Sequence, residues 1–563
     1  MTVFALINRD THLKKSAYSY LILASLSGLC NALILAIINI TADNVSAIQY
    51  NNQILYFLVF FIFAVATYCL AQQQLMLRFS SHIEQMLNDI RLTIISHIRQ
   101  CDFHDIEEIN SERIYITLSK ELEIISQSSQ LLVTGGQVSI LLLFLLLYVL
   151  WLSVAAFIVL LACFSIGILL HLHDLKKTNN NIETSFKYEN RIIARLMDIL
   201  KGFREIKLNR KRANAIHSLY NKDSAALTAS RKKVKSSYIN NFVMSQASYL
   251  SIIGTIVFII PIIFTVDPET VLKLTVALLF MAGPISIIIS TVPIYTDANA
   301  AAKNIFQLEA DLASHQKVNS DANILTDFNE IKLKDVSFSY KKSQDEKLFE
   351  VGPLDFTLKK GKTVIITGSN GSGKTTLIHL LTGLYHPKKG AISIDGRQVI
   401  DAELDAFRNL FTSVFSDFHL FQHLYGIDEY SQEEAEEWFE FLEISEKVYL
   451  NNNRFSNVDL STGQKKRLAL LSCILENRPI FILDEWAADQ DPEFRSKFYH
   501  QILPRLKAAN KTIVAISHDD KYFHLADTQI KMADGKIIEV NELDSATPTP
   551  SNISPDNTEN KDC

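Results

Sequence analysis

The sequence predicts an α-helical membrane domain with six transmembrane helices, fused to an α/β domain built around a phosphate-binding loop. Three observations predict this fold class. The first half of the chain contains long runs without charged residues. The second half contains the stretch GSNGSGKT, Gly368–Thr375, between an apolar strand pattern and an apolar helix pattern. It also contains PIFILD, an apolar run that ends at Asp484 and is followed at once by Glu485.

The composition fits a chain that lies partly in a membrane. Hydrophobic residues make up 48% of the 563 residues and charged residues 21%. The formal net charge of −6 is small for this length, so we expect no nucleic-acid partner. Six cysteines are scattered along the chain without a CxxC pair, which favours reduced thiols over a disulfide framework or a zinc site.

The first domain is predicted over residues 1–310, because it contains six apolar segments of about the 20 residues that a spanning helix needs. They lie at about 17–40, 54–75, 131–150, 152–170, 242–264 and 271–294. We expect the first segment to be retained, since no signal-peptide cleavage site follows it. Buried core helices of a soluble protein are the alternative, but a run such as LLLFLLLYVL has no polar face.

The basic residues predict the orientation of the spans. Residues 77–128 contain five Lys or Arg and residues 173–241 contain sixteen, whereas the loops at 41–53 and 265–270 contain none. Basic loops stay in the cytoplasm. We therefore expect the N-terminus, both long connections and the C-terminal half on the cytoplasmic side of the membrane, whose lipids surround the spans.

Both long connections show helical patterning and are predicted to form helical hairpins in the cytoplasm. Lys201–Asn209, KGFREIKLN, contains a glycine near the middle of the second hairpin and is the candidate tip for contact with the C-terminal half. A solvated basic face near anionic lipid is the alternative. Several polar residues inside the spans are candidates for either helix–helix hydrogen bonds or substrate contacts. They are Asn31, Asn39, Gln72, Gln73, Gln74, Gln137 and Gln246.

The strand–loop–helix context of Gly368–Thr375 predicts binding of ATP and Mg²⁺. Glycines let backbone N–H groups point at phosphate oxygens, and the helix N-terminus adds the positive end of its dipole. Lys374 would reach the β- and γ-phosphates, and Thr375 would bind Mg²⁺. The predicted nucleotide contacts from this loop are Gly368, Ser369, Asn370, Gly371, Ser372, Gly373, Lys374, Thr375 and Thr376.

The adjacent carboxylates Asp484 and Glu485 would repel each other unless something nearby favours negative charge. A phosphate loop needs a magnesium partner on a neighbouring strand, and Asp484 is placed to provide it. Glu485 would then face the γ-phosphate and orient or deprotonate the attacking water. An acidic pair at a helix N-terminus is the structural alternative.

Three further motifs resemble the ABC-type ATPases. Leu460–Gln464, LSTGQ, is similar to the LSGGQ signature of that family, which implies nucleotide contacts from Ser461, Gly463 and Gln464. Tyr340 stands where the family has its adenine-stacking aromatic residue, and His518 where it has its switch histidine. Six spans followed by one ATPase domain, here 329–545 after a linker at 311–328, resemble the half-transporter arrangement of ABC exporters. Residues 546–563 are polar and are expected to be a disordered tail.

More narrowly, DEWAADQDPEFR, LSTGQKKR, GFREIKLNRKR, VFSDFHLF and ISHDDKYF resemble the bacterial cyclic-peptide exporter group. That group includes exporters of microcin-type peptides, syringomycin-like lipopeptides and pyoverdine precursors. Two features depart from the wider family. Ser416 occupies the position of a common loop glutamine, so that Asp417 is a candidate metal ligand in its place. Trp486 and the AADQD that follows it replace the more usual PTSALD, with Asp491 at the place of its aspartate.

The resemblance implies an ATP-driven exporter of a cyclic or modified peptide, or of a peptidic siderophore precursor. One phosphate loop and one signature in each chain imply a homodimer with shared ATP sites, in which Lys374, Glu485 and His518 are the predicted catalytic residues. Two alternatives remain open at this point. One is a lipid flippase or multidrug exporter, and the other is a membrane ATPase that acts as a sensor without transporting anything.

Overall fold

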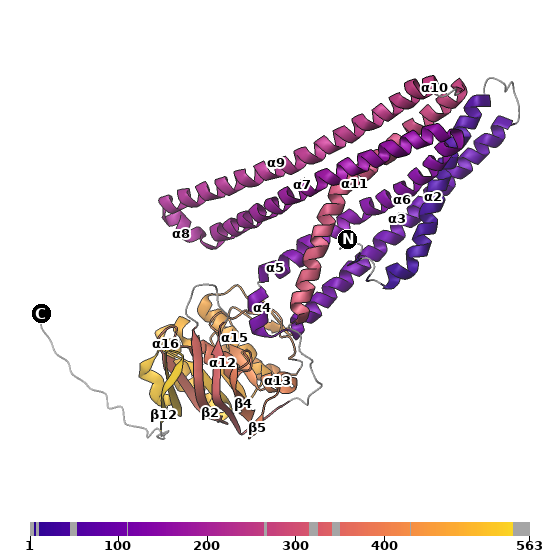
Figure 1. Ribbon diagram of the computed structural model, residues 1–563. Helices are drawn as coiled ribbons and strands as arrows, with labels where there is room; N and C mark the ends of the chain where they lie inside the picture. Colours follow the sequence, from indigo (N-terminus) through magenta and orange to yellow (C-terminus); the bar gives the residue numbers. More distant parts are fainter. Residues whose placement is uncertain are drawn as a thin grey trace, which may run out of the picture. The chain divides into compact units, whose positions relative to one another are not determined.

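The chain is described by a computed structural model that covers residues 11–44, 53–109, 111–263, 267–314, 325–340, 349–427 and 429–543, together with residues 5, 6 and 9. It forms two compact units (Figure 1). The first comprises Met1–Ser96 and Ser111–Asp311, and the second His97–Asn110 and Leu312–Cys563. The segment 97–110 thus groups with the second unit, although it lies inside the predicted membrane domain 1–310. The predicted linker 311–328 lies partly outside the described residues, and the predicted tail 546–563 wholly outside them.

The first unit consists of long helices, as its uncharged runs and helical connections predict. They are α2 (Thr11–Asn44), α3 (Gln53–Gln100, whose last turn belongs to the second unit), α5 (Ser111–Ile116), α6 (Leu122–Leu152), α7 (Val154–Lys201), α8 (Phe203–Leu208), α9 (Arg210–Gly254), α10 (Ile260–Ile263) and α11 (Pro268–Ser314). Short π-helical turns, Thr117–Glu121 and Thr255–Ile259, join α5 to α6 and α9 to α10.

Within the described residues, five helical stretches are long and apolar enough to cross a membrane. They are Tyr18–Thr41, Leu55–Gln100, Ser111–Leu152, Arg210–Ile263 and Pro268–Ser314. The fourth predicted span coincides with the start of α7, where a shorter apolar stretch, Val154–Ser165, is found. Ser153 separates α6 from α7 in an extended conformation, and its hydroxyl accepts a hydrogen bond from the N–H of Ala156. This tight turn separates the third predicted span from the fourth.

Four of the polar residues in the predicted spans hydrogen-bond a neighbouring helix. The amide of Gln137 donates to the Ser27 hydroxyl at 2.5 Å, and that hydroxyl donates to Gln72 at 3.3 Å. The other two pairs are Asn39 with Tyr148 at 3.0 Å and Gln246 with Ser286 at 2.6 Å. Of the two roles that the sequence left open, these contacts favour helix packing.

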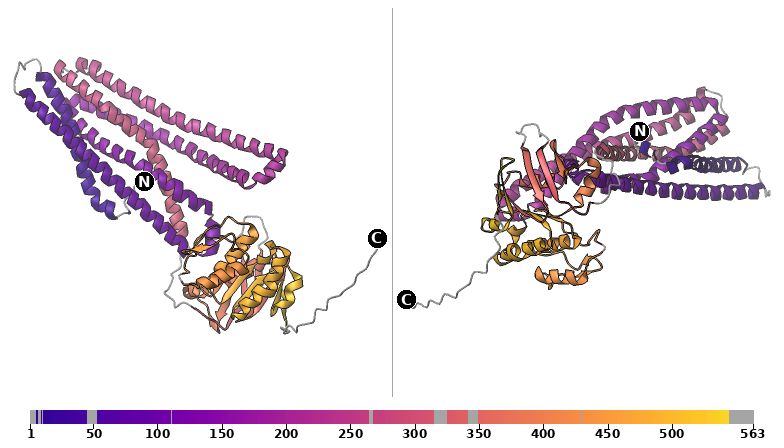
Figure 2. Two further views of the ribbon diagram at one scale, coloured as in Figure 1. Left: turned by 180° about the vertical axis from the view of Figure 1, so that it is seen from behind. Right: turned by 90° about the horizontal axis from the view of Figure 1, so that it is seen from below.

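The second predicted hairpin is formed by α7 and α9, which lie side by side with α8 at the turn (Figures 1 and 2). Glu189 of α7 pairs with Arg231 of α9 at 3.1 Å, and the hydroxyls of Ser185 and Ser230 share a hydrogen bond. Gly202 ends α7, and the Asn209 side chain caps the start of α9. The tip therefore lies within the predicted segment Lys201–Asn209.

The second unit contains the strands. They are β1 (Glu330–Ser339), β2 (Glu350–Lys359), β3 (Thr363–Gly368), β4 (Lys389–Ile394), β5 (Arg397–Gln398), β6 (Phe411–Val414), β7 (Leu450–Asn451), β8 (Arg454–Phe455), β9 (Ile480–Asp484), β10 (Thr512–Ile516), β11 (Thr528–Ala533) and β12 (Lys536–Glu542). Its longer helices are α4 (Phe103–Ile109), α12 (Lys374–Leu381), α13 (Leu404–Arg408), α14 (Gln432–Phe441), α15 (Thr462–Glu476), α16 (Pro492–Lys497) and α17 (Leu503–Ala508).

The larger of the two main sheets has the strand order β12-β11-β3-β10-β9-β6, and all its strands except β12 are parallel to their neighbours. The other is antiparallel, in the order β2-β1-β4-β5. β9 and β10 are buried throughout, as expected for central strands of a parallel sheet covered on both faces. Parallel order brings the carboxyl ends of these strands to one edge.

Candidate functional site

The candidate site lies where four neighbouring parallel strands end. Gly368 ends β3, Asp484 ends β9, and Ile516 of β10 pairs with Ile366 on one side and Asp484 on the other. Val414 ends β6 and pairs with Leu483. The residues that follow these strands are the phosphate loop, Glu485, the segment with His518, and the segment with Ser416. The topology therefore brings together the motifs that the sequence places up to 150 residues apart.

The loop from Gly368 to Gly373 has the backbone geometry of a phosphate cradle. Gly368 has a φ of 148°, and a Cβ there would lie 2.4 Å from the Met532 carbonyl oxygen. Gly373 has a φ of 97° and precedes the first turn of α12. Successive N–H groups at such a turn form an anion-binding site together with the helix N-terminus.

Lys374 folds back over this loop. Its ammonium donates to the carbonyl oxygens of Gly368 at 2.9 Å and Ser369 at 3.0 Å, so it lies where a phosphate group would be cradled. The Ser372 hydroxyl is buried and has no hydrogen-bond partner in the described part of the chain. The other predicted loop contacts lie at the surface or at the helix start: Ser369, Asn370, Gly371 and Thr375 are exposed, and Thr376 is buried.

Asp484 is buried, and only 2% of its surface is exposed. Burial raises the pKa of its carboxyl, and the adjacent Glu485 raises it further, while hydrogen bonds from the Ser416 hydroxyl and N–H oppose that shift. Its Oδ2 atom has no partner among the described residues. An unpartnered buried carboxylate oxygen is suited to a hard divalent cation.

No group of three or more His, Cys, Asp or Glu residues that could hold a metal is found in the described ranges. A cation at Asp484 would therefore need hydroxyl, water and phosphate oxygens to complete its shell. Ser416, at the position of the common glutamine, is the residue that contacts Asp484. Asp417 is exposed, and its carboxylate interacts electrostatically with His379. This arrangement favours Ser416 over Asp417 as the substitute for the glutamine.

Glu485 and His518 face each other across the ends of β9 and β10. His518 Nε2 lies 3.3 Å from Glu485 Oε1, and both side chains are partly exposed, at 50% and 37%. Glu485 has a φ of 50°, which is uncommon outside glycine, and its N–H donates to the Ile516 carbonyl oxygen at 3.2 Å. The carboxylate is therefore partly accessible at the sheet edge where the phosphate loop also begins, and it is not buried in the core.

The LSTGQ segment begins α15 with a capping box. The Ser461 hydroxyl accepts from the Gln464 N–H, and the Gln464 side chain accepts from the Ser461 N–H at 3.3 Å. Ser461 and Thr462 remain exposed. A Cβ on Gly463 would lie 2.9 Å from the Asp489 carbonyl oxygen, so a glycine is needed for α15 to pack against the segment after Glu485.

Comparisons with known proteins identify the family. A family model described as the ABC transporter transmembrane region matches residues 18–287, and one described as ABC transporter matches residues 351–488. The ATP-binding protein SyrD of Pseudomonas syringae pv. syringae is 31% identical over 475 residues, which are 81% of this chain and 82% of SyrD. The chain belongs to the ABC transporter family.

The chain is also similar to a lipid A-core flippase and to an exporter of known structure. The ATP-dependent lipid A-core flippase of Vibrio vulnificus strain YJ016 is 31% identical over 253 residues, which are 43% of this chain and 42% of the flippase. A structure of a bacterial Atm1-family ABC exporter with ATP bound has the same fold, with a TM-score of 0.76 at 16% identity, over 95% of this chain and 96% of that one. The protein is thus an ATP-hydrolysing ABC exporter half-transporter and a multi-pass membrane protein.

The departures of this transporter from common family motifs have structural roles. Trp486 is buried, stacks on Phe498 with 4.5 Å between ring centroids, and donates its indole N–H to the Lys466 carbonyl oxygen at 2.8 Å. Asp491 caps α16 through the Phe494 N–H and pairs with Arg467 at 3.0 Å. The sequence showed these departures but not their structural roles, which depend on Phe498 and on groups of α15.

Tyr340 lies beside the phosphate-loop helix of the transporter. Its hydroxyl and that of Thr376 share a hydrogen bond at 2.9 Å. Its ring also forms edge contacts with Phe338, Tyr385 and His104. An adenine-stacking role for Tyr340 remains a proposal, but the position next to α12 is suitable for it.

Helix α4 is part of the second unit, although it lies inside the first long connection of the chain. Asp102, just before it, pairs with Arg408 at 2.9 Å and His386 at 2.8 Å. Phe103 packs edge-on against His379 of α12, and the Tyr385 hydroxyl donates to Glu107 at 2.8 Å. The sequence signal for this helix was Asp102 followed by an acidic first turn, a pattern that predicts a helix start inside the first long connection.

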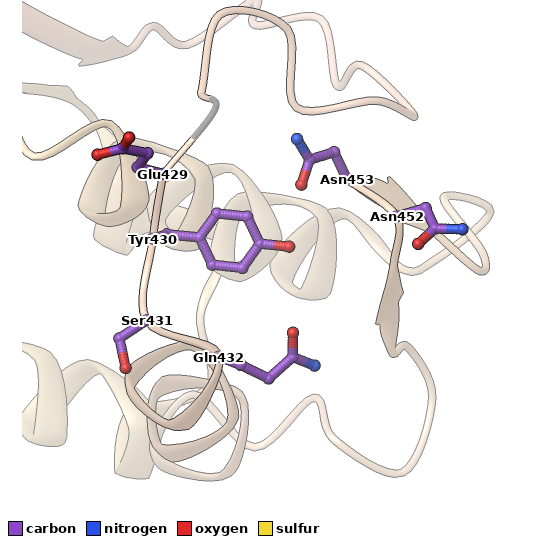
Figure 3. Close-up of a pocket in the computed structure, with 6 residues that line it drawn as sticks. All are labelled: Glu429, Tyr430, Ser431, Gln432, Asn452 and Asn453. Carbon is purple, nitrogen blue, oxygen red and sulfur yellow. The ribbon is translucent and has the colours of Figure 1, made fainter.

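A polar depression of about 700 Å³ opens between the start of α14 and the turn of β7 and β8 (Figure 3). Its lining residues are Glu429, Tyr430, Ser431, Gln432, Asn452 and Asn453. The α14 N-terminus is already capped by Ser431 and has acidic residues in its first turn, which disfavours an anion there. We assign no role to this depression in the reaction of the transporter.

Proposed function

We propose that this exporter uses ATP to move a cyclic or modified peptide, or a peptidic siderophore precursor, from the cytoplasm across the inner membrane. The observation that supports this cargo class is the extent of the similarity to SyrD, which covers 81% of the chain. The lipid A-core flippases match over 37–49% of the chain. A match that covers most of both chains includes most of the transport helices, where cargo is recognised.

At the ATP site, the geometry supports the following proposed roles. Lys374 and the loop N–H groups would hold the phosphates, and Tyr340 would stack on the adenine. Asp484 and Thr375 would hold Mg²⁺, which supplies charge neutralisation at the phosphates when bound. Glu485 would orient and deprotonate the attacking water, and His518, 3.3 Å away, would keep the Glu485 carboxylate directed at it.

The proposed assembly is a homodimer. The signature at the start of α15 is exposed, and each chain has one such signature and one phosphate loop. Two chains would provide two composite ATP sites, in which Ser461, Gly463 and Gln464 of one chain complete the site of the other. The basic connections at 77–128 and 173–241 support placing the ATPase domain in the cytoplasm.

A lipid flippase is the second candidate function, because several relatives of about 30% identity are lipid A-core flippases. Inside-out membrane vesicles distinguish the candidates. Wild-type vesicles with ATP should accumulate a labelled cyclic lipopeptide, and Glu485→Gln vesicles should not. ATP-dependent translocation of labelled lipid A without peptide uptake would favour the flippase. Stimulated ATP hydrolysis with neither substrate moved would favour a sensor, and peptide uptake only in right-side-out vesicles would overturn the direction.

A further inference from the structure

Lys466 is a buried cation on the second turn of α15 that contacts the backbone of Glu485, the proposed catalytic base. Its side chain is 2% exposed. The ammonium donates to the backbone carbonyl oxygen of Glu485 at 2.7 Å and pairs with Asp489 at 2.7 Å. Removing a lysine from water is costly unless its charge is satisfied, so these two contacts account for its presence in the core.

The carbonyl that Lys466 binds belongs to a residue held in a sparsely populated conformation. Glu485 has a φ of 50°, and its own N–H is fixed by the Ile516 carbonyl oxygen of β10. Lys466 fixes the peptide group that follows Glu485, through the Glu485 carbonyl oxygen. With both flanking peptides held, the backbone directs the Glu485 side chain toward His518 and keeps it there.

Two additional contacts fasten the same segment to α15. The Trp486 indole N–H donates to the carbonyl oxygen of Lys466 itself, and the Gln490 amide donates to the carbonyl oxygen of Gly463 at 3.1 Å. Lys466 thus donates to the segment through its side chain and accepts from it through its backbone. These hydrogen bonds hold the first turns of α15 and the residues after β9 together.

We propose that Lys466 is a positioning residue for Glu485: its ammonium holds the Glu485 peptide so that the carboxylate is aimed at the attacking water. The inference rests on the proposed role of Glu485 and not on the cargo. Because Lys466 sits on the helix that begins with Ser461, the link also joins the signature of a chain to the base of that same chain. In the proposed dimer these two groups serve different ATP sites.

The chain provides a matched control at the other end of the same helix. Lys511 donates to the Asn477 carbonyl oxygen at 3.1 Å, and Asn477 is the C-terminal cap of α15. Lys511→Met therefore removes an ammonium–carbonyl contact to α15 of the same chemical kind, but one at the C-terminal end of the helix, away from the turn that carries Lys466. Any general weakening of α15 should affect both variants.

The test is ATP hydrolysis by the full-length protein in nanodiscs. We expect Lys466→Met to lower kcat about 10–100-fold with KM for ATP unchanged, because misplacing a catalytic group by about 1 Å has an effect of that order. Lys466→Arg should recover part of the rate, and Lys511→Met should stay within about twofold of wild type. A raised KM with unchanged kcat, or an equal loss in Lys511→Met, would overturn the proposal.

A second measurement separates positioning from a structural role. In a Glu485→Gln background, single-turnover hydrolysis should be no slower when Lys466→Met is added, since Lys466 acts through the carboxylate. If Lys466 has only a structural role, Lys466→Met should slow hydrolysis by the same factor in the wild-type and the Glu485→Gln backgrounds. That result would contradict the proposal. If Lys466→Met does not fold, the double variant Lys466→Met/Asp489→Asn, which leaves no unpaired charge, replaces it in both backgrounds. Normal hydrolysis by Glu485→Gln itself would instead sink the proposed role of Glu485.

Discussion

Asp484 and Glu485 are adjacent in sequence but lie in different surroundings. Asp484 points into the buried end of β9, where an oxygen is left without a partner, while Glu485 is 37% exposed and faces His518. The left-handed turn at Glu485 separates the two side chains. One carboxylate is thereby suited to hold a cation and the other to handle water, although their residue types differ by a single methylene.

Replacing Glu485 by Gln should preserve ATP binding and nearly abolish turnover. The amide keeps the size of the side chain and cannot accept a proton from the attacking water. Loss of a general base costs about 10²–10⁴-fold in rate. Equilibrium binding of a fluorescent ATP analogue and steady-state phosphate release, measured on the same preparation, check both halves of this expectation. Wild-type turnover in the variant would show that another residue acts as the base.

Replacing Asp484 by Asn should stabilise the nucleotide-free protein and remove its response to Mg²⁺. Burial and the neighbouring Glu485 raise the pKa of the Asp484 carboxyl, so the ionised form is held at a cost in folding stability at neutral pH. A neutral amide removes that cost. We expect a higher Tm without nucleotide, by about 2–4 °C for each kcal/mol recovered.

MgATP should raise the Tm of the same Asp484→Asn variant less than it raises the Tm of the wild type. MgATP raises the Tm of any protein that binds it only when folded, and the variant lacks a carboxylate for the metal. Thermal unfolding of the full-length protein with ATP alone and with MgATP gives the comparison. Equal stabilisation of both proteins by MgATP would remove Asp484 from the metal site, and a lower Tm without nucleotide would contradict the burial argument.

The elements show where sequence reasoning succeeds and where it stops. The phosphate loop, β9 and the hairpin tip were predictable, because glycine spacing, an apolar run and a glycine between helical patterns are local features. Helix α4 was not, because its importance depends on Arg408, His386 and Tyr385, which are roughly 280 to 310 residues further along the chain. Nothing in residues 97–110 alone reveals that they fold with the second unit.

The segment after Glu485 illustrates the same limit. The sequence showed that Trp486 departs from the common motif, but its role required knowing that Phe498 and the Lys466 carbonyl lie around the ring. Likewise, the sequence placed Ser416 at the position of the common glutamine but named Asp417 as the candidate metal ligand in its place. The contact between Ser416 and Asp484 favours the first, since it arises from the pairing of β6 with β9 and not from any local pattern.

Phe203 of α8 should couple ATP use to transport. Its ring is 51% exposed at the tip of the α7–α9 hairpin, with the Lys207 ammonium 5.4 Å from the ring centroid. We expect Phe203→Ala to hydrolyse ATP and fail to move cargo, because the loss of an apolar anchor removes about 1–3 kcal/mol of contact. Leu219→Ala, an exposed apolar residue on α9 away from the tip, is the control. If Phe203→Ala vesicles take up cargo as well as Leu219→Ala and wild-type vesicles do, Phe203 is not part of the coupling tip.

The whole transporter carries its ATPase motifs in single copies. Lys374 begins α12, and Ser461 begins α15 and is exposed at that helix's N-terminus. The Ser461 hydroxyl takes part in the capping box, while Ser461 and Thr462 stay exposed at the N-terminus of α15 and accessible to a second chain. A second chain placed head to tail would provide a phosphate loop at each exposed signature.

A mixture of two inactive chains tests this arrangement. Lys374→Ala should lose the phosphate contact, and Ser461→Ala should lose the signature contact, so each homodimer carries a lesion in both of its sites. In a heterodimer of the two, one composite site combines both lesions and the other has neither. We therefore expect vanadate trapping of nucleotide to recover to about half of the wild-type level per heterodimer, since one of two sites is intact.

Two differently tagged chains, purified on one tag and then on the other, ensure that only heterodimers are measured. The matched control is a heterodimer of wild type with a chain that carries both substitutions. If the sites are shared, that control places one lesion in each composite site and should trap little nucleotide, whereas sites contained within single chains would reverse the two results, with the control active and the complementing pair inactive.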